Sequence, residues 1–316
     1  MSTATRVPET WGLSGDDARR ALAANGRMRL LRDAFVRLRA ADGFSHSRSL
    51  AFATSLVFVQ GLVVVVGLVA ASGTSGVGRV IVDTIRSATP GPAGEVLADA
   101  VRQANRVGGH DRYLALLVGL VGTLVTATTA MGQLERGFNR VYGIEKDRPT
   151  AEKYRRAFLL AVSIGAALTA AFVLLALGRD IRGGDGALHT LWIAVRWPLG
   201  LLVAAAAIGA LLHFAPYRRQ PGRAWLAFAA LVCVAGWSLV TLALGLAFGL
   251  SSTFGDTYGP LAGLVALQLW TFLSAASIFY GAAVAAQLEA VRAGVPAPSA
   301  AEAGRETHRP ASQAPA

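Results

Sequence analysis

The chain has 316 residues, of which 53% are hydrophobic and only 16% are charged, and its formal net charge is +11. A mean hydropathy of +0.47 together with this positive charge is unusual for a soluble domain. The basic residues gather in short segments between long apolar stretches, which indicates a membrane protein and argues against a nucleic-acid partner. Cys233 is the single cysteine, so the chain can form no internal disulfide and no multi-cysteine metal site.

The first 48 residues contain no apolar stretch long enough to cross a membrane. Residues 1–15 are polar and predict a disordered tail, and residues 16–48 predict a cytoplasmic, basic amphipathic helix with a break near Gly26. In its second part apolar residues recur at three- and four-residue spacing, opposite Arg29, Arg32, Arg37 and Arg39. Two placements stay open. Either these arginines bind anionic lipid headgroups at the inner membrane surface, or the helix packs on the protein's own cytoplasmic face.

Six apolar stretches follow, and they predict an all-α, polytopic membrane helix bundle over residues 49–289. The first, residues 50–72, is free of charge and forms roughly 34 Å of helix, enough to cross a hydrocarbon core of about 30 Å. The other expected transmembrane helices cover residues 113–133, 158–177, 197–214, 225–250 and 260–288. Six transmembrane helices are therefore expected.

The segments outside these stretches are of two kinds. The outer loop, residues 73–111, holds two shorter amphipathic pieces separated by Pro90 and Pro92, which predict interfacial helices in a hairpin that either covers the outer face or partly re-enters the membrane. Residues 290–316 are rich in Ala, Pro, Ser and Glu and predict a disordered tail. Lys and Arg are more frequent after the second and fourth stretches than after the third and fifth, so both termini should be cytoplasmic.

Polar side chains inside the apolar stretches are the first candidate functional groups, because an unpaired amide in lipid costs on the order of a few kcal/mol. Gln60 and Gln268 should each face another helix or an aqueous cavity, and both are candidate contacts for a transported molecule. His213, near the inner end of the fourth stretch, is either an interfacial side chain or a proton relay. No Asp, Glu or Lys falls at bilayer depth, unlike in most ion-coupled transporters.

A second candidate is the charged cluster at the inner end of the second stretch, which contains Arg136, Asn139 and Arg140 beside Glu135. It either anchors the helix end among the headgroups or binds a lipid headgroup or phosphate. Gly245 and Gly249 form a GxxxG pair that predicts close helix packing. We expect no catalytic, cofactor or metal site, because the histidines have no metal-binding spacing and no nucleophile or phosphate-loop motif occurs.

Four segments of the chain resemble the YihY/virulence factor BrkB family. Glu135–Gly143 resembles the family's "ALNRIYG" segment, Leu50–Phe52 its "LAY", His213–Arg218 its "YrxxPn", and Thr257–Gly259 followed by Trp270 and Gly281 its "sYG…W…GAE". The resemblance extends from about Asp33 to Glu289. Gln60 stands where the family usually has Pro, and Ala283 where it usually has Glu, which puts any role of that Glu in doubt for this chain.

The resemblance implies a bacterial inner-membrane protein with six transmembrane helices and both termini inside. It implies little about activity: members were once labelled ribonuclease BN, and others are linked to serum resistance or to lipid export. Our leading hypothesis is a protein that moves, or helps to move, a lipid or another amphiphile. The alternative is a non-transporting scaffold that organises the envelope. An enzyme, ribonuclease included, ranks third, and a homo-oligomer stays open.

Overall fold

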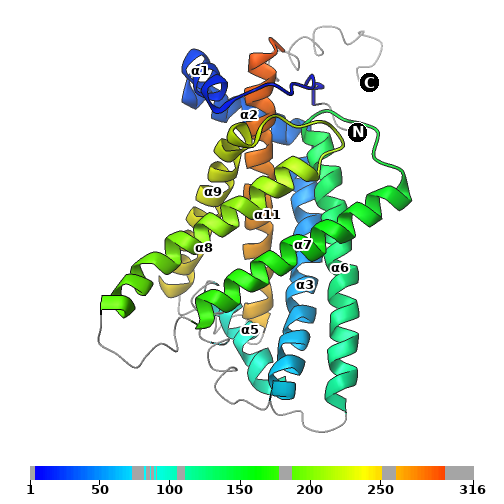
Figure 1. Ribbon diagram of the computed structural model, residues 1–316, viewed down its shortest axis with the longest axis vertical. Helices are drawn as coiled ribbons and strands as arrows, with labels where there is room; N and C mark the ends of the chain where they lie inside the picture. The colour runs from blue at the N-terminus through cyan, green and yellow to red at the C-terminus, as the bar shows by residue number, and fades with distance from the viewer. Residues whose placement is uncertain are drawn as a thin grey trace, which may run out of the picture.

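The computed structural model describes residues 4–72, 82, 86, 89, 91–104, 111–177, 187–250 and 261–295. In these ranges the regular secondary structure is helical, without strands, as expected (Figure 1). The helices are α1 (Gly15–Asn25), α2 (Arg27–Ala40), α3 (Gly43–Ser72), α5 (Gly91–Ala104), α6 (Asp111–Val141), α7 (Thr150–Leu177), α8 (Ala187–Phe214), α9 (Arg223–Leu250) and α11 (Ala262–Arg292).

The long helices lie side by side along the long axis of the molecule (Figure 1). The helix α3 packs between α6 and α11, α9 packs on α11, and α7 and α8 run obliquely across the bundle. The start of α1, α2 and the end of α11 lie at one end, whereas α5 lies at the opposite end. We call the first of these ends, formed by residues 4–14, 142–149 and 215–222, the polar end.

Three described stretches are long and apolar enough to cross a membrane: Leu116–Val141, Arg223–Leu250 and Ala262–Arg292. A shorter apolar helical stretch runs over Pro198–Phe214. Large apolar side chains are exposed on these and neighbouring helices, including Leu120, Val125, Leu159, Leu239, Leu242 and Leu246. Such a surface would be unstable in water, and it is what a lipid-facing helix presents.

Glycine allows the closest helix contacts, although not at the expected GxxxG pair. A Cβ at Gly281 of α11 would collide with the sulfur of Cys233 on α9, and a Cβ at Gly137 of α6 would collide with the Phe279 ring. By contrast, a Cβ at Gly245 or Gly249 would meet no described atom within 4 Å. The bundle is therefore held by small residues at other positions, and the GxxxG prediction was wrong for these described contacts.

The N-terminal tail is not disordered over its described part. Residues 4–14 cross the polar end, where the Val7 side chain is 3% exposed and its amide donates to the Tyr142 carbonyl at 3.1 Å. The tail stays in place because buried charged groups bind its backbone, as shown below. At the other terminus α11 continues to Arg292, so the predicted start of the disordered tail at residue 290 was too early. Residues 296–316 lie outside the described part.

The basic helix is divided in two and packs on the protein. Gly26, with a φ of 79°, separates α1 from α2, as expected from the sequence. The helix α2 lies against α11, and Leu30, Ala34 and Leu38 are buried there. Arg37 is also fully buried, so it cannot contact lipid headgroups and that prediction was wrong. The other three arginines of the set are exposed: Arg29, Arg32 and Arg39.

The outer loop is described in part. Its second amphipathic piece forms α5, which buries Ala93 and Leu97 against Leu244 of α9 and Trp270 of α11. The first piece lies outside the described residues apart from isolated positions. Helix α8 begins at Ala187, earlier than expected, so that Pro198 lies inside a helix rather than near its first turn.

Candidate functional site

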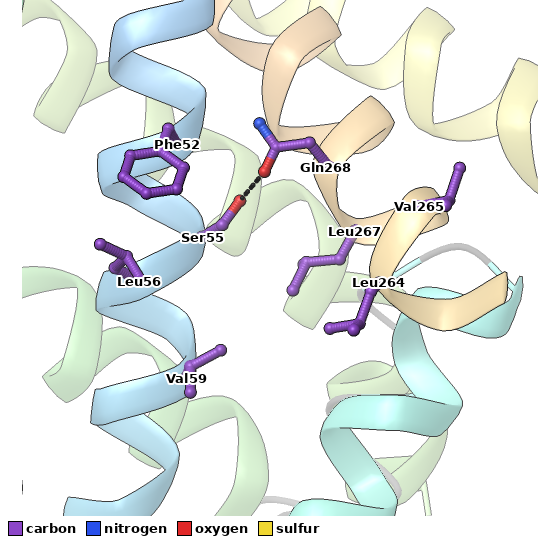
Figure 2. A pocket seen from close by; sticks show the side chains of 8 residues that line it. All are labelled: Phe52, Ser55, Leu56, Val59, Leu264, Val265, Leu267 and Gln268. Atoms are coloured by element: carbon purple, nitrogen blue, oxygen red, sulfur yellow. Dashed lines mark hydrogen bonds between the residues drawn. The ribbon is translucent and has the colours of Figure 1, made fainter. Parts of the chain in front are cut away.

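A groove opens on the surface of the bundle between α3 and α11 (Figure 2). Its volume is about 360 Å³. Its walls are almost entirely apolar and are formed by Phe52, Leu56, Val59, Leu264, Val265 and Leu267. Most of these side chains are strongly exposed, so the groove faces the same surroundings as the apolar outer surface of the bundle.

Two polar side chains interrupt this apolar wall. The Ser55 hydroxyl of α3 lies 3.0 Å from Oε1 of Gln268 on α11 and 3.0 Å from the Thr271 hydroxyl. The Ala51 carbonyl of its own helix lies 2.9 Å away, so the single Ser55 proton is shared between that carbonyl and Oε1 of Gln268. Gln268 thus lies on the exposed wall of a groove, where it can contact a molecule that enters from the surface.

Gln60 faces another helix. Its Oε1 accepts a hydrogen bond of 2.8 Å from the Thr126 hydroxyl of α6, and a Cβ at Gly122 would lie 3.1 Å from the amide. Gln60 therefore faces α6, whereas Gln268 lines the groove between α3 and α11. The two glutamines do not line a common described cavity. Gln60 contributes to the packing of α3 on α6.

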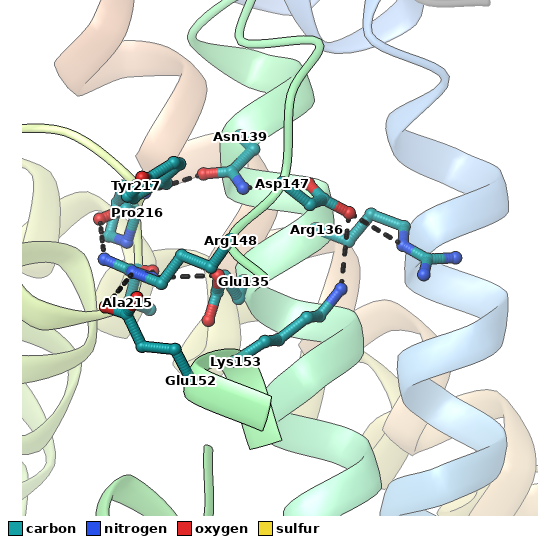
Figure 3. A network of polar contacts seen from close by, with 10 residues as sticks. All are labelled: Glu135, Arg136, Asn139, Asp147, Arg148, Glu152, Lys153, Ala215, Pro216 and Tyr217. Carbon is teal, nitrogen blue, oxygen red and sulfur yellow. Dashed lines mark hydrogen bonds and ion pairs between the residues drawn. The ribbon is translucent and has the colours of Figure 1, made fainter. Parts of the chain in front are cut away.

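Asn139, at the polar end, joins two connections between helices (Figure 3). Its Nδ2 donates to Asp147 at 3.0 Å, and its Oδ1 accepts the Tyr217 backbone N–H at 2.8 Å. Asn139 is fully buried, so the prediction that it contacts a headgroup was wrong. The amide has both a donor and an acceptor, which is what bridging a carboxylate and a backbone N–H requires.

The charged residues around Asp147 are held in the same network (Figure 3). Lys153 Nζ and Arg136 Nε each lie 3.3 Å from Oδ2 of Asp147. Burial alone would raise the pKa of Asp147, but the hydrogen bond from Asn139 and the Lys153 ammonium outweigh it and lower that pKa. Arg136 remains exposed, while Arg140 donates to the carbonyls of the following turn.

Arg148 and Glu135 form a buried ion pair beside this network (Figure 3). The distance is 2.8 Å, and both side chains are almost fully shielded. Arg148 also donates to the carbonyl oxygens of Ala215 and Pro216 at 2.9 and 2.8 Å. One guanidinium thus connects the α6 helix, the start of α7 and the end of α8, using several of its five fixed donors.

Arg218 and Glu289 form a second buried pair that holds the N-terminal segment. Their distance is 2.6 Å. Arg218 also donates to the Pro8 carbonyl at 3.0 Å, and the Thr10 amide donates to Glu289 at 3.1 Å. The Arg218 guanidinium stacks over the Tyr142 ring, 4.5 Å from its centroid.

Arg37 completes the hold on this segment. Its Nε donates to Gln287 of α11 at 2.9 Å and its Nη1 to the Thr5 carbonyl at 3.0 Å. Burial lowers the pKa of Arg37 to about 10 and, together with the Glu289 carboxylate, raises the pKa of Tyr142. The segment's own backbone carbonyls therefore accept from two buried cations, although Nη2 of Arg37 and Nη1 of Arg218 have no described hydrogen-bond partner. A pocket of about 580 Å³ remains at this end, between the segment and residues 143–146.

His213 has no catalytic partner in the described part of the chain. Its ring stands edge-on to Phe214 at 4.7 Å, and its buried Nδ1 meets no hydrogen-bond partner there. No described cluster of three His, Cys, Asp or Glu side chains could hold a metal ion.

Sequence reasoning missed the buried charges of the polar end, because it used the Lys and Arg residues after the second and fourth stretches only to infer orientation. One signal was available: Glu289 is a carboxylate near the C-terminal end of a helix, where the helix dipole disfavours negative charge. Such a residue needs a specific cation. The partner itself comes from a distant connection and could not be identified from spacing.

Comparison with known proteins places the chain among membrane proteins. The family model described as Virulence factor BrkB matches residues 34–306. The ribonuclease-like protein YfkH of Bacillus subtilis is 24% identical over 66% of this chain and 77% of its own length. UPF0761 membrane proteins of Methylibium petroleiphilum and Verminephrobacter eiseniae are 29% and 30% identical over 54% and 57% of this chain, which covers 41% and 43% of their lengths. No solved structure shows a significant match.

Proposed function

Because this chain belongs to the virulence factor BrkB family and is a multi-pass membrane protein, we propose that it moves a lipid or another amphiphile across the bacterial inner membrane. The observation that carries the proposal is the groove between α3 and α11. It is apolar along its walls, is open to the surface and contains a polar pair, Ser55 and Gln268. This combination suits a molecule with a long apolar part and a small polar part.

The distribution of charge supports an amphiphile rather than an ion. The described charged groups that are buried all lie at or beside the polar end: Asp33, Arg37, Glu135, Arg148, Lys153, Arg218 and Glu289. The groove is lined by none of them. A transporter driven by protons or ions usually carries a carboxylate or histidine along its path.

In the proposed topology, α3, α6, α7, α8, α9 and α11 all cross the membrane. Over the described residues, α6, α9 and α11 contain stretches with the length and hydropathy of a transmembrane helix. The helices α3, α7 and α8 have 30, 28 and 28 residues. A helix of 28 residues is about 42 Å long, enough for a tilted transmembrane helix. The polar end, with its excess of Lys and Arg, would face the cytoplasm, so that both termini lie inside.

Reconstitution of the purified protein into liposomes tests the proposal. A fluorescent phospholipid present in both leaflets is bleached from outside with dithionite, and the protein should increase the fraction that becomes accessible. Liposomes without protein and liposomes with heat-denatured protein are the controls. Equal flip rates with and without protein, across several headgroups, would contradict a lipid-moving function.

A scaffold is the second candidate, and the densely bonded polar end favours it. Five segments distant in sequence meet there through buried ion pairs and hydrogen bonds, which would hold a fixed surface for a partner. A scaffold would co-purify with a stable partner and would leave lipid flipping unchanged. RNA incubated with the same preparation should stay intact under either function.

A further inference from the structure

The side-chain amide of Gln268 has an unused donor in an apolar groove. Its Oε1 accepts from Ser55 at 3.0 Å, whereas its Nε2 donates to no described residue. Figure 2 shows the nitrogen on the side away from Ser55. The two N–H bonds of this amide are therefore available to a bound molecule.

No described hydrogen bond joins the neighbouring hydroxyls to that nitrogen. Ser55 lies between the Ala51 carbonyl and the Gln268 oxygen, and Thr271 donates back to the Leu267 carbonyl at 2.9 Å. The Ser55 hydroxyl thus stabilises one orientation of the Gln268 amide, with its oxygen toward α3, and the Thr271 hydroxyl contacts Ser55 at 3.0 Å. The nitrogen is turned away from Ser55 (Figure 2).

The groove lies at a depth where water is scarce if α3 crosses the membrane as proposed. Ser55 comes five residues after the start of the apolar stretch at Leu50, which is about 7.5 Å along the helix. An unpaired N–H is strongly unfavourable in hydrocarbon. The acceptor must therefore arrive on a molecule that itself enters an apolar groove.

We propose that the groove binds a glycerolipid, with an acyl chain along Phe52, Leu56 and Leu264 and an ester carbonyl accepting a hydrogen bond from Nε2 of Gln268. The inference rests on the proposed function and identifies its substrate class. An ester carbonyl is an acceptor without a charge or a donor, so it loses less in leaving water than a phosphate does.

Lipids that differ only in the ester carbonyl provide the test. The full-length protein is reconstituted with equal amounts of diacyl and dialkyl phosphatidylglycerol of the same chain length, extracted in mild detergent, and its retained lipids are counted by mass spectrometry. Wild-type protein should retain the diacyl form about two- to tenfold more, the range expected for one hydrogen bond. Gln268→Leu should bring that ratio close to one.

Thr129→Val is the matched control. Thr129 is an exposed residue of α6 whose hydroxyl donates to its own helix at the Val125 carbonyl, at 2.9 Å, so its loss should leave the ratio unchanged. Equal retention of both lipids by the wild-type protein would overturn the inference. So would a preference that survives in Gln268→Leu.

The two proposals fail in different ways. If diacyl and dialkyl probes are flipped equally fast and retained equally, the ester inference is wrong and the lipid-moving function stands. If neither probe is flipped, the lipid-moving function is wrong whatever the retention ratio. If Gln268→Leu dissociates an oligomer and the wild-type ratio is one, a second copy of the chain covers the groove and the inference is overturned.

Discussion

The guanidinium of Arg218 lies 2.6 Å from the carboxylate of Glu289, and their side chains are only 1% and 0% exposed. Arg218 belongs to the α8–α9 connection and Glu289 to the last turns of α11. The same two side chains hold Pro8 and Thr10 of the N-terminal segment. One buried ion pair therefore joins three parts of the chain that are far apart in sequence.

Removing one partner of this pair should be strongly destabilising, because it leaves the other charge buried and unpaired. We expect Glu289→Gln to lower the free energy of unfolding by about 3 kcal/mol. The measurement is thermal unfolding in detergent. Asp16→Asn is the control, because the Asp16–Arg19 pair is 82% and 87% exposed and its loss should not measurably change Tm. Equal shifts in the two variants would show that the buried pair has no special role.

The pH dependence of stability should report Asp147. Its pKa is lowered in the folded protein, so its stabilising effect is present above the ordinary value of about 3.9 and is lost as pH falls through the folded value. We expect wild-type protein to exceed Asp147→Asn in Tm by a constant amount from about pH 8 to about pH 5. Toward about pH 3 the difference should shrink. A difference that does not change with pH would exclude this role.

Cysteine labelling can show how firmly the N-terminal segment is held. Within this segment the Val7 side chain is buried, whereas the Glu9 side chain, two residues later, is exposed. A water-soluble maleimide should label Glu9→Cys at least tenfold faster than Val7→Cys. Adding Thr10→Val, which removes the hydroxyl that contacts Glu289, should speed labelling of Val7→Cys alone. The wild-type chain gives the background, since Cys233 is buried.

The hydrogen bond between Gln60 and Thr126 predicts an effect on stability. A double-mutant cycle with Gln60→Leu and Thr126→Val should give a coupling energy of about 0.5–1.5 kcal/mol in thermal or chemical unfolding. Gln60→Leu should leave the lipid ratio described above unchanged, because the amide does not line the groove. Strictly additive effects would mean that the two side chains do not stabilise each other.

Periodicity and hydropathy identified the helices but not their contacts. The first five apolar stretches fall within helices and the sixth does so from Ala262, because a continuous apolar run of this length is compatible with little else. Helix ends were less accurate: α6 continues to Val141 and α8 begins at Ala187. Helix α6 continues past its apolar run through Glu135, whose charge is compensated by Arg148 of the following connection, and hydropathy does not report such partners.

The sequence placed some candidate residues correctly and others not. Gln268 was found from sequence and lies in the groove, because an amide in an apolar run is conspicuous. Asn139 and Arg37 were assigned to the surface, yet tertiary contacts bury both of them. A helical pattern gives the face of a polar residue but not what covers that face. Burial of the polar end depends on residues 4–14, whose sequence carries no periodic signal.

Closing the groove is the most direct test of the central proposal that it carries a lipid. Leu56→Trp fills the groove, while Leu159→Trp places the same ring on an exposed part of α7 outside it. In liposomes with equal amounts of folded protein, we predict that Leu159→Trp flips a fluorescent phospholipid as fast as wild type and that Leu56→Trp is at least fivefold slower. Equal rates for the two variants would contradict the account.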